Sequence, residues 1–330
     1  MQQTIGAKEL FSCDLLLRRK EILADFINKN NSINDDTDIM HIAFAVDSTY
    51  VKYAGITAHS VIKNHQGASL CFHLFVDEIS QLDKDNFIKL AQNAQASVYV
   101  YYFNPAYFTS LPVLHHFSTA MYYRLAIAEI LKDVAQRVLY LDADVLCVDE
   151  IYSLYRMDLQ DKVAAVVLDL GINTKYLAYS AHTRLFGLQP TNMYFNSGVM
   201  LIDIAAWHAK RINDKIVAVL TQTKHHCLFE CPDQDVLNVA LQNDVVFVPP
   251  QYNWQQWHTH EALIDNKWAS IKLVHFLGVM KPWDNKGINA TYDEYYASSP
   301  WVRTPKPAVH PYARHLCAVP AAQKVSYRCF

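Results

Sequence analysis

A short apolar run that ends at two carboxylates constrains the fold of this chain more than any other stretch. Residues 137–146 read RVLYLDADVL. The first half of this run favours strands and is typical of a buried strand, although a buried helix segment can show the same pattern. Because strand side chains alternate between faces, we expect Asp142 and Asp144 to point the same way.

The carboxylates of Asp142 and Asp144 are candidate metal ligands. Two like charges directed at one point repel each other unless a cation or protons lie between them. Hard divalent cations prefer oxygen ligands, and open α/β sheets bind their ligands beyond the carboxyl ends of strands. The pair therefore predicts a metal at the end of a central strand. The alternative is a solvated strand end with two unrelated acids.

Strand-like and helix-like segments alternate along the chain around this run. Further strands are expected at 41–46, 70–76, 97–103, 163–168, 197–202, 245–248 and 271–276, and helices at 53–63, 80–93, 118–132, 203–220 and 235–241. This alternation favours an α/β fold with a mostly parallel open sheet and helices on both faces. Such a sheet would bring the acids that follow three of its strands, Asp47, Asp142 and Asp169, to one edge.

The two ends of the chain differ from its middle. Residues 8–29 have apolar positions near helical spacing and predict an amphipathic helix, and the polar segment 28–38 predicts a linker. After Glu294 the chain has no further Asp or Glu, but it has five Lys or Arg residues and five Pro residues. Such a tail can rest on an anionic lipid surface, at about 1 kcal/mol per basic residue, or it can wrap around the domain.

Composition narrows the class of protein. The chain has 330 residues, of which 52% are hydrophobic and 18% charged, as expected for a globular protein with a sizeable core. Its net charge of −3 gives no signal for nucleic acid. The apolar runs are shorter than the roughly 20 residues that a transmembrane helix needs, and the N-terminus shows no secretory signal. Seven scattered cysteines are typical of reduced thiols in a cytoplasmic protein.

A second segment with chemical potential is VHFLGVMKPW at 274–283. The eight glycines of the chain form no phosphate-binding loop, so a bound diphosphate would need a metal and side chains to hold it. Gly278 permits close backbone approach to a ligand, and Lys281 can neutralise a phosphate. Together with Asp142 and Asp144, His275 would offer two oxygens and one imidazole, a set that suits Mn²⁺. A histidine in an apolar strand is, however, more often a core residue.

Three other segments carry weaker signals. PDQD at 232–235 contributes to a site or supplies the acids that a helix N-terminus favours. YFNSG at 194–198 places an amide and a small turn before a strand. HHC at 225–227, with Cys231, offers ligands for Zn²⁺, but it lacks the paired C-x-x-C spacing of common zinc sites.

Four motifs occur together in an order found in one family. They are LYLDAD at 139–144, YFNSGV at 194–199, DQDVLN at 233–238 and HFLGVMKPW at 275–283. With them, residues 39–283 resemble glycosyltransferase family 8, and within it the bacterial lipopolysaccharide core α-glucosyl- and α-galactosyltransferases. SPW at 299–301 also resembles this branch. The resemblance implies a GT-A domain at 39–290, with an N-terminal helical extension and linker at 1–38 and a basic, Pro-rich tail at 291–330.

The resemblance also implies the ligands of the site. Asp142, Asp144 and His275 would hold Mn²⁺, or Mg²⁺ in its place, and the donor would be UDP-glucose or UDP-galactose. The residues implied to bind the donor are Asp47, Thr49, Tyr50, Arg124, Asp142, Ala143, Asn196, Gly278 and Lys281. The family often has Asn where Thr49 stands. The residues implied around the donor sugar and the acceptor are His116, Asp169, Asn196, Asp233 and Gln234.

The implied reaction retains the anomeric configuration of the sugar. Gln234 would be the group nearest to the far face of the sugar, and an amide is a poor nucleophile. We therefore expect front-side attack, in which the departing phosphate accepts the proton of the acceptor hydroxyl. The metal, Lys281 and Arg124 would stabilise the UDP leaving group, while Asp233 and Asp169 would stabilise the cationic sugar.

The implied role is addition of one hexose to the outer core of lipopolysaccharide at the cytoplasmic face of the inner membrane. The acceptor is then lipid-linked and anionic, which suits peripheral contact of the basic tail with the membrane. A homo-oligomer is compatible with the sequence. The alternatives are a transferase with a protein or oligosaccharide acceptor, a non-catalytic UDP-sugar-binding protein, and a metal-dependent phosphohydrolase.

Overall fold

The structure is a computed structural model that describes residues 11–12, 16–27, 39–108, 119–170, 193–223, 231–255, 270–278, 280–284 and 289–302. Its centre is an eight-stranded sheet with the order β1-β4-β3-β2-β5-β8-β7-β9. These strands are β1 Leu17–Ala24, β2 Ile39–Val46, β3 Ser69–Val76, β4 Ser97–Phe103, β5 Arg137–Leu141, β7 Ala164–Leu168, β8 Phe195–Asp203 and β9 Val245–Phe247. A second sheet has the order β10-β11-β6 and contains β6 Val145–Cys147, β10 Trp254–Gln255 and β11 Leu273–His275.

The large sheet is mostly parallel, as the sequence predicts. β2 pairs in parallel with β3 and with β5, and β3 pairs in parallel with β4. β8 runs antiparallel to both β5 and β7, so β7 has the same direction as β5. As a result, Asp47, Asp142 and Asp169, which follow β2, β5 and β7, lie at one edge of the sheet.

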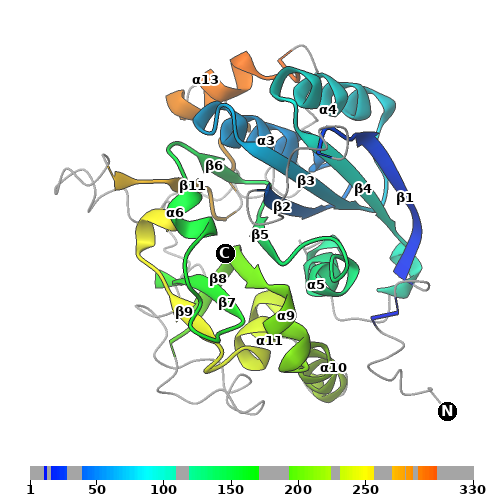
Figure 1. The fold of residues 1–330 in the computed structure, drawn as a ribbon, viewed down its shortest axis with the longest axis vertical. Helices are drawn as coiled ribbons and strands as arrows, with labels where there is room; N and C mark the ends of the chain where they lie inside the picture. The colour runs from blue at the N-terminus through cyan, green and yellow to red at the C-terminus, as the bar shows by residue number, and fades with distance from the viewer. Residues whose placement is uncertain are drawn as a thin grey trace, which may run out of the picture.

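Helices cover both faces of this sheet (Figure 1). The helices packed on one face are α3 Val51–Asn64, α4 Gln81–Ala94, α6 Tyr152–Tyr155 and α13 Ala290–Ser298. Those on the other face are η3 Thr119–Ala126, α5 Ile127–Ile130, α9 Ile204–Ala209, α10 Ile212–Thr223 and α11 Pro232–Ala240. Every residue of β2 is buried, with Ile42 and Phe44 in one core and Ala43 and Ala45 in the other. A strand buried on both faces explains why its sequence is almost uniformly apolar.

The helix predicted at 8–29 is wrong for residues 17–24. Residues 17–24 form β1, an edge strand that runs antiparallel to β4. The edge of β4 exposes backbone N–H and C=O groups that a strand can satisfy and a helix cannot. Side chains add to the pairing, because the Arg19 guanidinium lies 4.0 Å from the Tyr102 ring centroid and Glu21 accepts a hydrogen bond from Lys84 at 2.8 Å. Tertiary pairing therefore overrides the local helical spacing.

The helix predicted at 118–132 is a 3₁₀ helix, η3, followed by the single turn of α5. Two further 3₁₀ turns are η2 Pro105–Tyr107 and η4 Pro250–Tyr252. The other predicted helices and strands agree with observed elements to within a few residues, whereas α6, β10 and α13 were not predicted and the run at 137–146 is divided into β5 and β6.

The beginning of the predicted C-terminal tail packs on the domain. Trp301 is fully buried, and its indole Nε1 donates a hydrogen bond to Asp83 Oδ1 at 2.8 Å. Its ring lies against α3 at Gly55, where an added Cβ would be 2.2 Å from the indole. Residues 303–330, which carry the basic side chains of the tail, lie outside the described residues. Within the described part of the chain, no helix combines the length and apolar character needed to cross a membrane.

Candidate active site

Two carboxylates and one imidazole meet beyond the end of β5. His275 Nε2 lies 3.2 Å from Asp144 Oδ1 and 3.8 Å from Asp142 Oδ2. One ligand atom from each of the three residues lies within 4.8 Å of the others. His275 ends β11, which runs antiparallel to β6, so the pairing of the small sheet carries the imidazole to the acids. The three predicted metal ligands therefore converge on one point.

The acids converge for a different reason from the one that the sequence indicates. Strand β5 ends at Leu141, and residues 142–144 form a turn before β6, so strand alternation does not align the two carboxylates. Instead, Asp142 N donates to Gly198 O at 2.8 Å, and Phe276 N donates to Asp144 O at 3.0 Å. These main-chain bonds hold the turn between β8 and the residue after β11.

Gly198 is required by close packing at this point. A Cβ on residue 198 would lie 2.2 Å from His275 Cε1 and 2.7 Å from Asp142 Oδ2. Any side chain here would separate the imidazole from the carboxylate. The glycine of the YFNSG segment therefore makes room for the His275–Asp142 approach.

Two cations balance the acids. Arg124 NH2 lies 2.9 Å from Asp142 Oδ1, and Arg124 Nε lies 3.0 Å from Asp233 Oδ2. The Lys281 ammonium is 2.5 Å from Asp144 Oδ2 and also donates to Phe276 O at 2.9 Å. Arg124 and Lys281 thus join the turn after β5 to η3, to the start of α11 and to the segment after β11.

The protonation of these groups follows from their surroundings. Burial raises the pKa of Asp144, but the Lys281 ammonium and His275 act in the opposite direction and prevail, so its pKa lies well below the usual range. Burial raises the pKa of Asp233, only partly offset by Arg124. Burial, with the nearby Asp144 carboxylate, raises the pKa of Tyr50 to about 12. Asp144 is therefore a carboxylate at neutral pH, and Tyr50 keeps its proton.

A chain of side-chain amides orients His275, and sequence reasoning missed its key member, Asn253. The Gly198 N–H donates to Asn196 Oδ1 at 3.0 Å, and the same oxygen accepts from Asn253 Nδ2 at 2.9 Å. Asn253 Oδ1 therefore faces His275 Nδ1, at 2.9 Å, and that nitrogen must carry a proton to donate. Nε2 is then the ring nitrogen on the side of the two acids, and with a cation between them it would offer its lone pair to that cation. No motif marks Asn253, which lies between η4 and β10.

The amide chain continues to the residues predicted around the sugar. Asp169 Oδ2 accepts from Asn196 Nδ2 and from Gln234 Nε2, both at 3.2 Å. Gln234 Oε1 accepts from Ser197 N at 3.0 Å, so both ends of this amide are engaged. Asp169, Asn196 and Gln234 are all buried. The structure therefore joins these three side chains to the His275 cluster through Asn253.

The two acids at the start of α11 have different roles. Asp235 Oδ2 accepts from Cys231 N at 3.0 Å and so satisfies a backbone donor at the helix start. Asp233 also has backbone hydrogen bonds at the helix start, and in addition it faces Arg124. The prediction of helix-start acids is therefore right for both residues, and Asp233 also belongs to the cluster.

The remaining predicted residues lie along the same edge or fall outside the described part of the chain. Thr49 donates to Asp47 Oδ1 through both its N–H, at 3.0 Å, and its hydroxyl, at 2.6 Å. Ala143 lies between the two acids, and its carbonyl accepts from Thr57 at 3.1 Å. Gly278 has a φ of +84°, which favours glycine. His116 and the HHC segment at 225–227 lie outside the described residues, so the predicted roles of His116 and of a zinc site remain predictions.

The sequence matches the profile of the family described as Glycosyl transferase family 8 over residues 41–287. The lipopolysaccharide glucosyltransferase WaaO of Escherichia coli is 28% identical over 298 residues, which are 88% of this chain and 87% of the relative. A lipopolysaccharide 1,2-glucosyltransferase of Escherichia coli is 30% identical over 275 residues, 80% of each chain. A lipopolysaccharide 1,3-galactosyltransferase of Salmonella typhimurium is 29% identical over 288 residues, 86% of this chain and 85% of the relative.

Solved structures show the same fold. A crystal structure of an active-site mutant of LgtC superposes with a TM-score of 0.65 at 25% identity, covering 78% of this chain and 94% of LgtC. The galactosyltransferase LgtC in complex with donor and acceptor sugar analogues superposes with a TM-score of 0.67 at 24% identity, covering 84% of this chain and 99% of LgtC.

Proposed function

Because this chain belongs to glycosyltransferase family 8, we propose that it transfers glucose or galactose from a UDP-sugar to the lipopolysaccharide core, with a divalent cation. The family makes it a glycosyltransferase. The named lipopolysaccharide glucosyl- and galactosyltransferases among its relatives support the hexose and the acceptor. The observation that carries the proposal is the convergence of Asp142, Asp144 and His275 beside two cations.

The residues at the site fit a divalent metal. Two carboxylate oxygens and a neutral imidazole suit Mn²⁺, and Mg²⁺ less well because it prefers oxygen ligands. Asp142, Asp144 and His275 would hold the ion, with Asn253 fixing the imidazole so that its Nε2 lone pair is available. When bound, the ion would supply positive charge to the diphosphate of the leaving group.

Lys281 and Arg124 are placed to act on the leaving group. In the structure both cations are paired with the carboxylates that would hold the metal. With those carboxylates engaged in holding the ion, Lys281 and Arg124 would be available to the diphosphate oxygens. Positive groups positioned where negative charge develops stabilise the departure of UDP.

The buried amide cluster would bind the sugar. Asp169, Asn196 and Gln234 hold one another through hydrogen bonds, so their positions are set before a substrate arrives. Gln234 is uncharged and its amide is engaged at both ends, which argues against covalent attack on the sugar. The bond from the anomeric carbon to the phosphate oxygen would break. The acceptor hydroxyl would bond to that carbon on the same face, passing its proton to the departing phosphate.

The proposal extends to the setting of the reaction. The acceptor is anionic and lipid-linked, so we place the enzyme at the cytoplasmic face of the inner membrane, with the basic residues after 302 as the contact. A homo-oligomer is compatible with this arrangement. The catalytic domain would be centred on residues 39–290 and would include β1 and the packed residues 290–302, with the rest of the two ends outside it.

A donor screen tests the proposal. Purified full-length chain is incubated with UDP-glucose, UDP-galactose and other UDP-sugars, with Mn²⁺ or with a chelator, and with truncated lipopolysaccharide core acceptors. The expected result is an acceptor mass gain of one hexose that requires the metal. Release of phosphate from simple esters without hexose transfer would instead identify a phosphohydrolase. Binding of UDP-sugar without turnover on any acceptor would identify a binding protein, and a covalent glycosyl adduct on the enzyme would refute front-side attack.

A further inference from the structure

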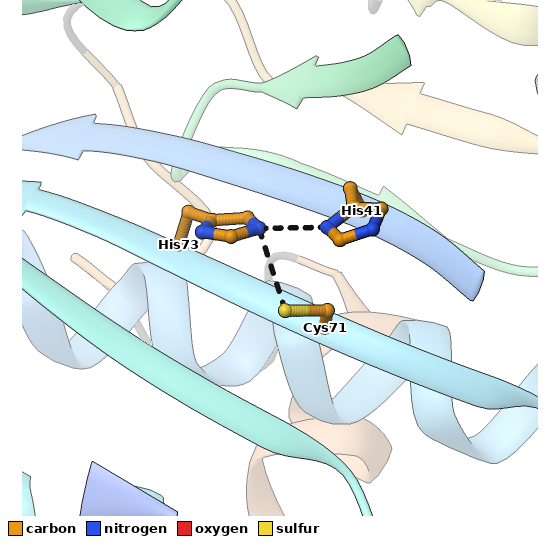
Figure 2. A group of neighbouring side chains, drawn as sticks. All are labelled: His41, Cys71 and His73. Carbon is orange, nitrogen blue, oxygen red and sulfur yellow. Dashed lines mark hydrogen bonds between the residues drawn. The ribbon is translucent and has the colours of Figure 1, made fainter. Parts of the chain in front are cut away.

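A second group of metal-type side chains lies inside the sheet, away from the active site. His41 of β2 faces Cys71 and His73 of β3 (Figure 2). His41 and Cys71 are register partners on the two parallel strands, and His73 lies two residues further on the same face. All three side chains are buried, with exposed fractions of 4% or less. The group lies toward the start of β2 and β3, whereas Asp142, Asp144 and His275 lie beyond the strand ends.

The spacing of the three donor atoms fits a shared ion. His73 Nε2 lies 3.0 Å from His41 Nδ1 and 3.4 Å from Cys71 Sγ, and all three ligand atoms lie within 4.8 Å of one another. Donors around a three-coordinate metal are separated by roughly 3.5 Å for two nitrogens and roughly 3.7 Å for nitrogen and sulfur, given bond lengths of about 2.0 and 2.3 Å. The two contacts of His73 are within about half an ångström of these values, and the His41–Cys71 pair would close on the ion from within 4.8 Å.

The hydrogen-bond capacity of His73 is poorly matched to its neighbours without an ion. Nε2 of His73 has either one proton to donate or one lone pair to accept with, yet two hydrogen-bonding atoms, His41 Nδ1 and Cys71 Sγ, approach it. Its other nitrogen, Nδ1, lies 3.2 Å from the Tyr101 hydroxyl. With an ion on Nε2, the Nδ1–H would donate to that hydroxyl, which would fix the orientation of the ligating imidazole.

We propose that His41, Cys71 and His73 form a binding site for a soft monovalent metal ion, Cu⁺, that is distinct from the active site. Thiolate and imidazole are the ligands that Cu⁺ prefers, and three of them suffice for a trigonal site. On binding, the Cys71 thiol releases its proton to solvent as the copper–sulfur bond forms, and no atom changes oxidation state.

Charge favours Cu⁺ over Zn²⁺ in this position. One thiolate neutralises Cu⁺, whereas Zn²⁺ would leave a net positive charge among buried groups, which is costly. The Lys20 ammonium adds to this cost, because it lies 4.8 Å and 5.3 Å from the ring centroids of Tyr99 and Tyr101, beside the cluster.

Binding would stabilise the sheet without changing the active site. The ion would join side chains of β2 and β3, and a ligand that binds only the folded chain raises its stability. We therefore expect the melting temperature to rise by a few degrees with Cu⁺, while metal-dependent turnover with saturating Mn²⁺ stays the same.

The test is an anaerobic titration of the reduced full-length chain with Cu⁺ held by a chromophoric competing chelator. The chain has other cysteines and histidines that can take copper, so variants are compared. Cys71→Ala removes the proposed sulfur ligand. Cys147→Ala is the matched control, because Cys147 is an equally buried strand thiol that donates to Asp149 O at 3.1 Å. The wild type and Cys147→Ala should bind one more tightly held equivalent than Cys71→Ala, and only these two should gain thermal stability.

Equal copper binding by all three proteins would overturn the proposal, and so would an equal loss in both variants. Cys71-dependent binding of Zn²⁺ without binding of Cu⁺ would overturn the choice of metal. If Cys71→Ala does not fold, X-ray absorption spectroscopy of the copper-loaded wild type tests the proposal by identifying the atoms bound to copper. One sulfur and two nitrogen neighbours are expected, and a sulfur-free or two-sulfur environment would contradict the proposal.

Discussion

The two groups of metal-type side chains on this sheet differ in how their charge is managed. Asp142 and Asp144 are partly exposed, at 22% and 14% of the side chain, and each is paired with a cation. His41, Cys71 and His73 are all buried. Carboxylates repel each other and need compensation, whereas neutral imidazoles and a thiol can share a dry interior. The comparison shows why the hard-ligand group lies at an open sheet edge and the soft-ligand group lies within the sheet.

The largest expected effect comes from breaking the charged group. Asp144→Ala should lower metal-dependent hexose transfer by about 10²- to 10³-fold, because it removes a metal ligand and the partner of Lys281. Turnover with each UDP-sugar and the Mn²⁺ affinity are the measurements. Asp214→Ala, at an exposed pair with Arg211, is the control and should behave as wild type. Full activity in Asp144→Ala would remove this carboxylate from the site.

Two glycine substitutions separate the site from the scaffold. Gly198→Ala should weaken Mn²⁺ binding by at least about tenfold, since its Cβ would lie 2.2 Å from His275 Cε1. Gly55→Ala should leave Mn²⁺ affinity unchanged but lower stability by about 1–3 kcal/mol, because its Cβ would meet the Trp301 indole. Mn²⁺ titration and thermal melting of both variants make the comparison. An unchanged Mn²⁺ affinity in Gly198→Ala would show that the backbone can shift to accommodate the methyl group, and would contradict the requirement for glycine at this position.

The amide chain offers a sharper test of how His275 is oriented. Asn253→Ala should lower Mn²⁺ affinity by about 10- to 100-fold, because Nδ1 of His275 loses its acceptor. Asn253→Asp keeps an acceptor for Nδ1 but loses the donor to Asn196 Oδ1, so it should retain more affinity than Asn253→Ala. Electron paramagnetic resonance of free Mn²⁺ measures both. Equal affinity in the wild type and the two variants would rule out the orienting role.

The smallest expected effect is a pH dependence at the contact between α3 and α13. His59 Nε2 lies 3.0 Å from Ser298 Oγ, and burial, with the nearby Lys63, lowers the pKa of His59 from 6.5 to about 4. Because folding favours the neutral ring, its contribution to stability is complete above pH 6.5 and is lost as the pH falls through 4. The protection factors of residues 289–302 against hydrogen exchange, taken relative to the intrinsic rate at each pH, should therefore fall between pH 6.5 and 4. His59→Gln cannot titrate and should show a weaker pH dependence; an identical profile would exclude His59.

Much of the fold was predictable because local patterns and tertiary contacts agree. The strands at 41–46, 70–76 and 97–103 are apolar apart from His41, His73 and Ser97, and they lie in the middle of the sheet, where both faces are buried. Residues 17–24 could not be assigned in this way. Their partner, β4, lies more than seventy residues away in the chain, so no local pattern could indicate the pairing.

The site was predictable in its members and not in its geometry. Asp142, Asp144 and His275 stand out as polar residues at the ends of apolar segments. That they converge depends on a turn held by Gly198 and Phe276, and not on the strand alternation that the sequence indicates. Asn253 has no distinguishing neighbours in the sequence, and its role comes only from the atoms that surround it.

By itself, the sequence determined the α/β class, the mostly parallel order of its central strands and the residue types gathered at their ends, because hydrophobic periodicity and chemical type are local properties. Only the tertiary structure decided that β1 joins the sheet, that Trp301 packs on Gly55 and that His41, Cys71 and His73 meet. Each of these contacts joins separate segments of the chain, and its geometry depends on packing that no local pattern encodes.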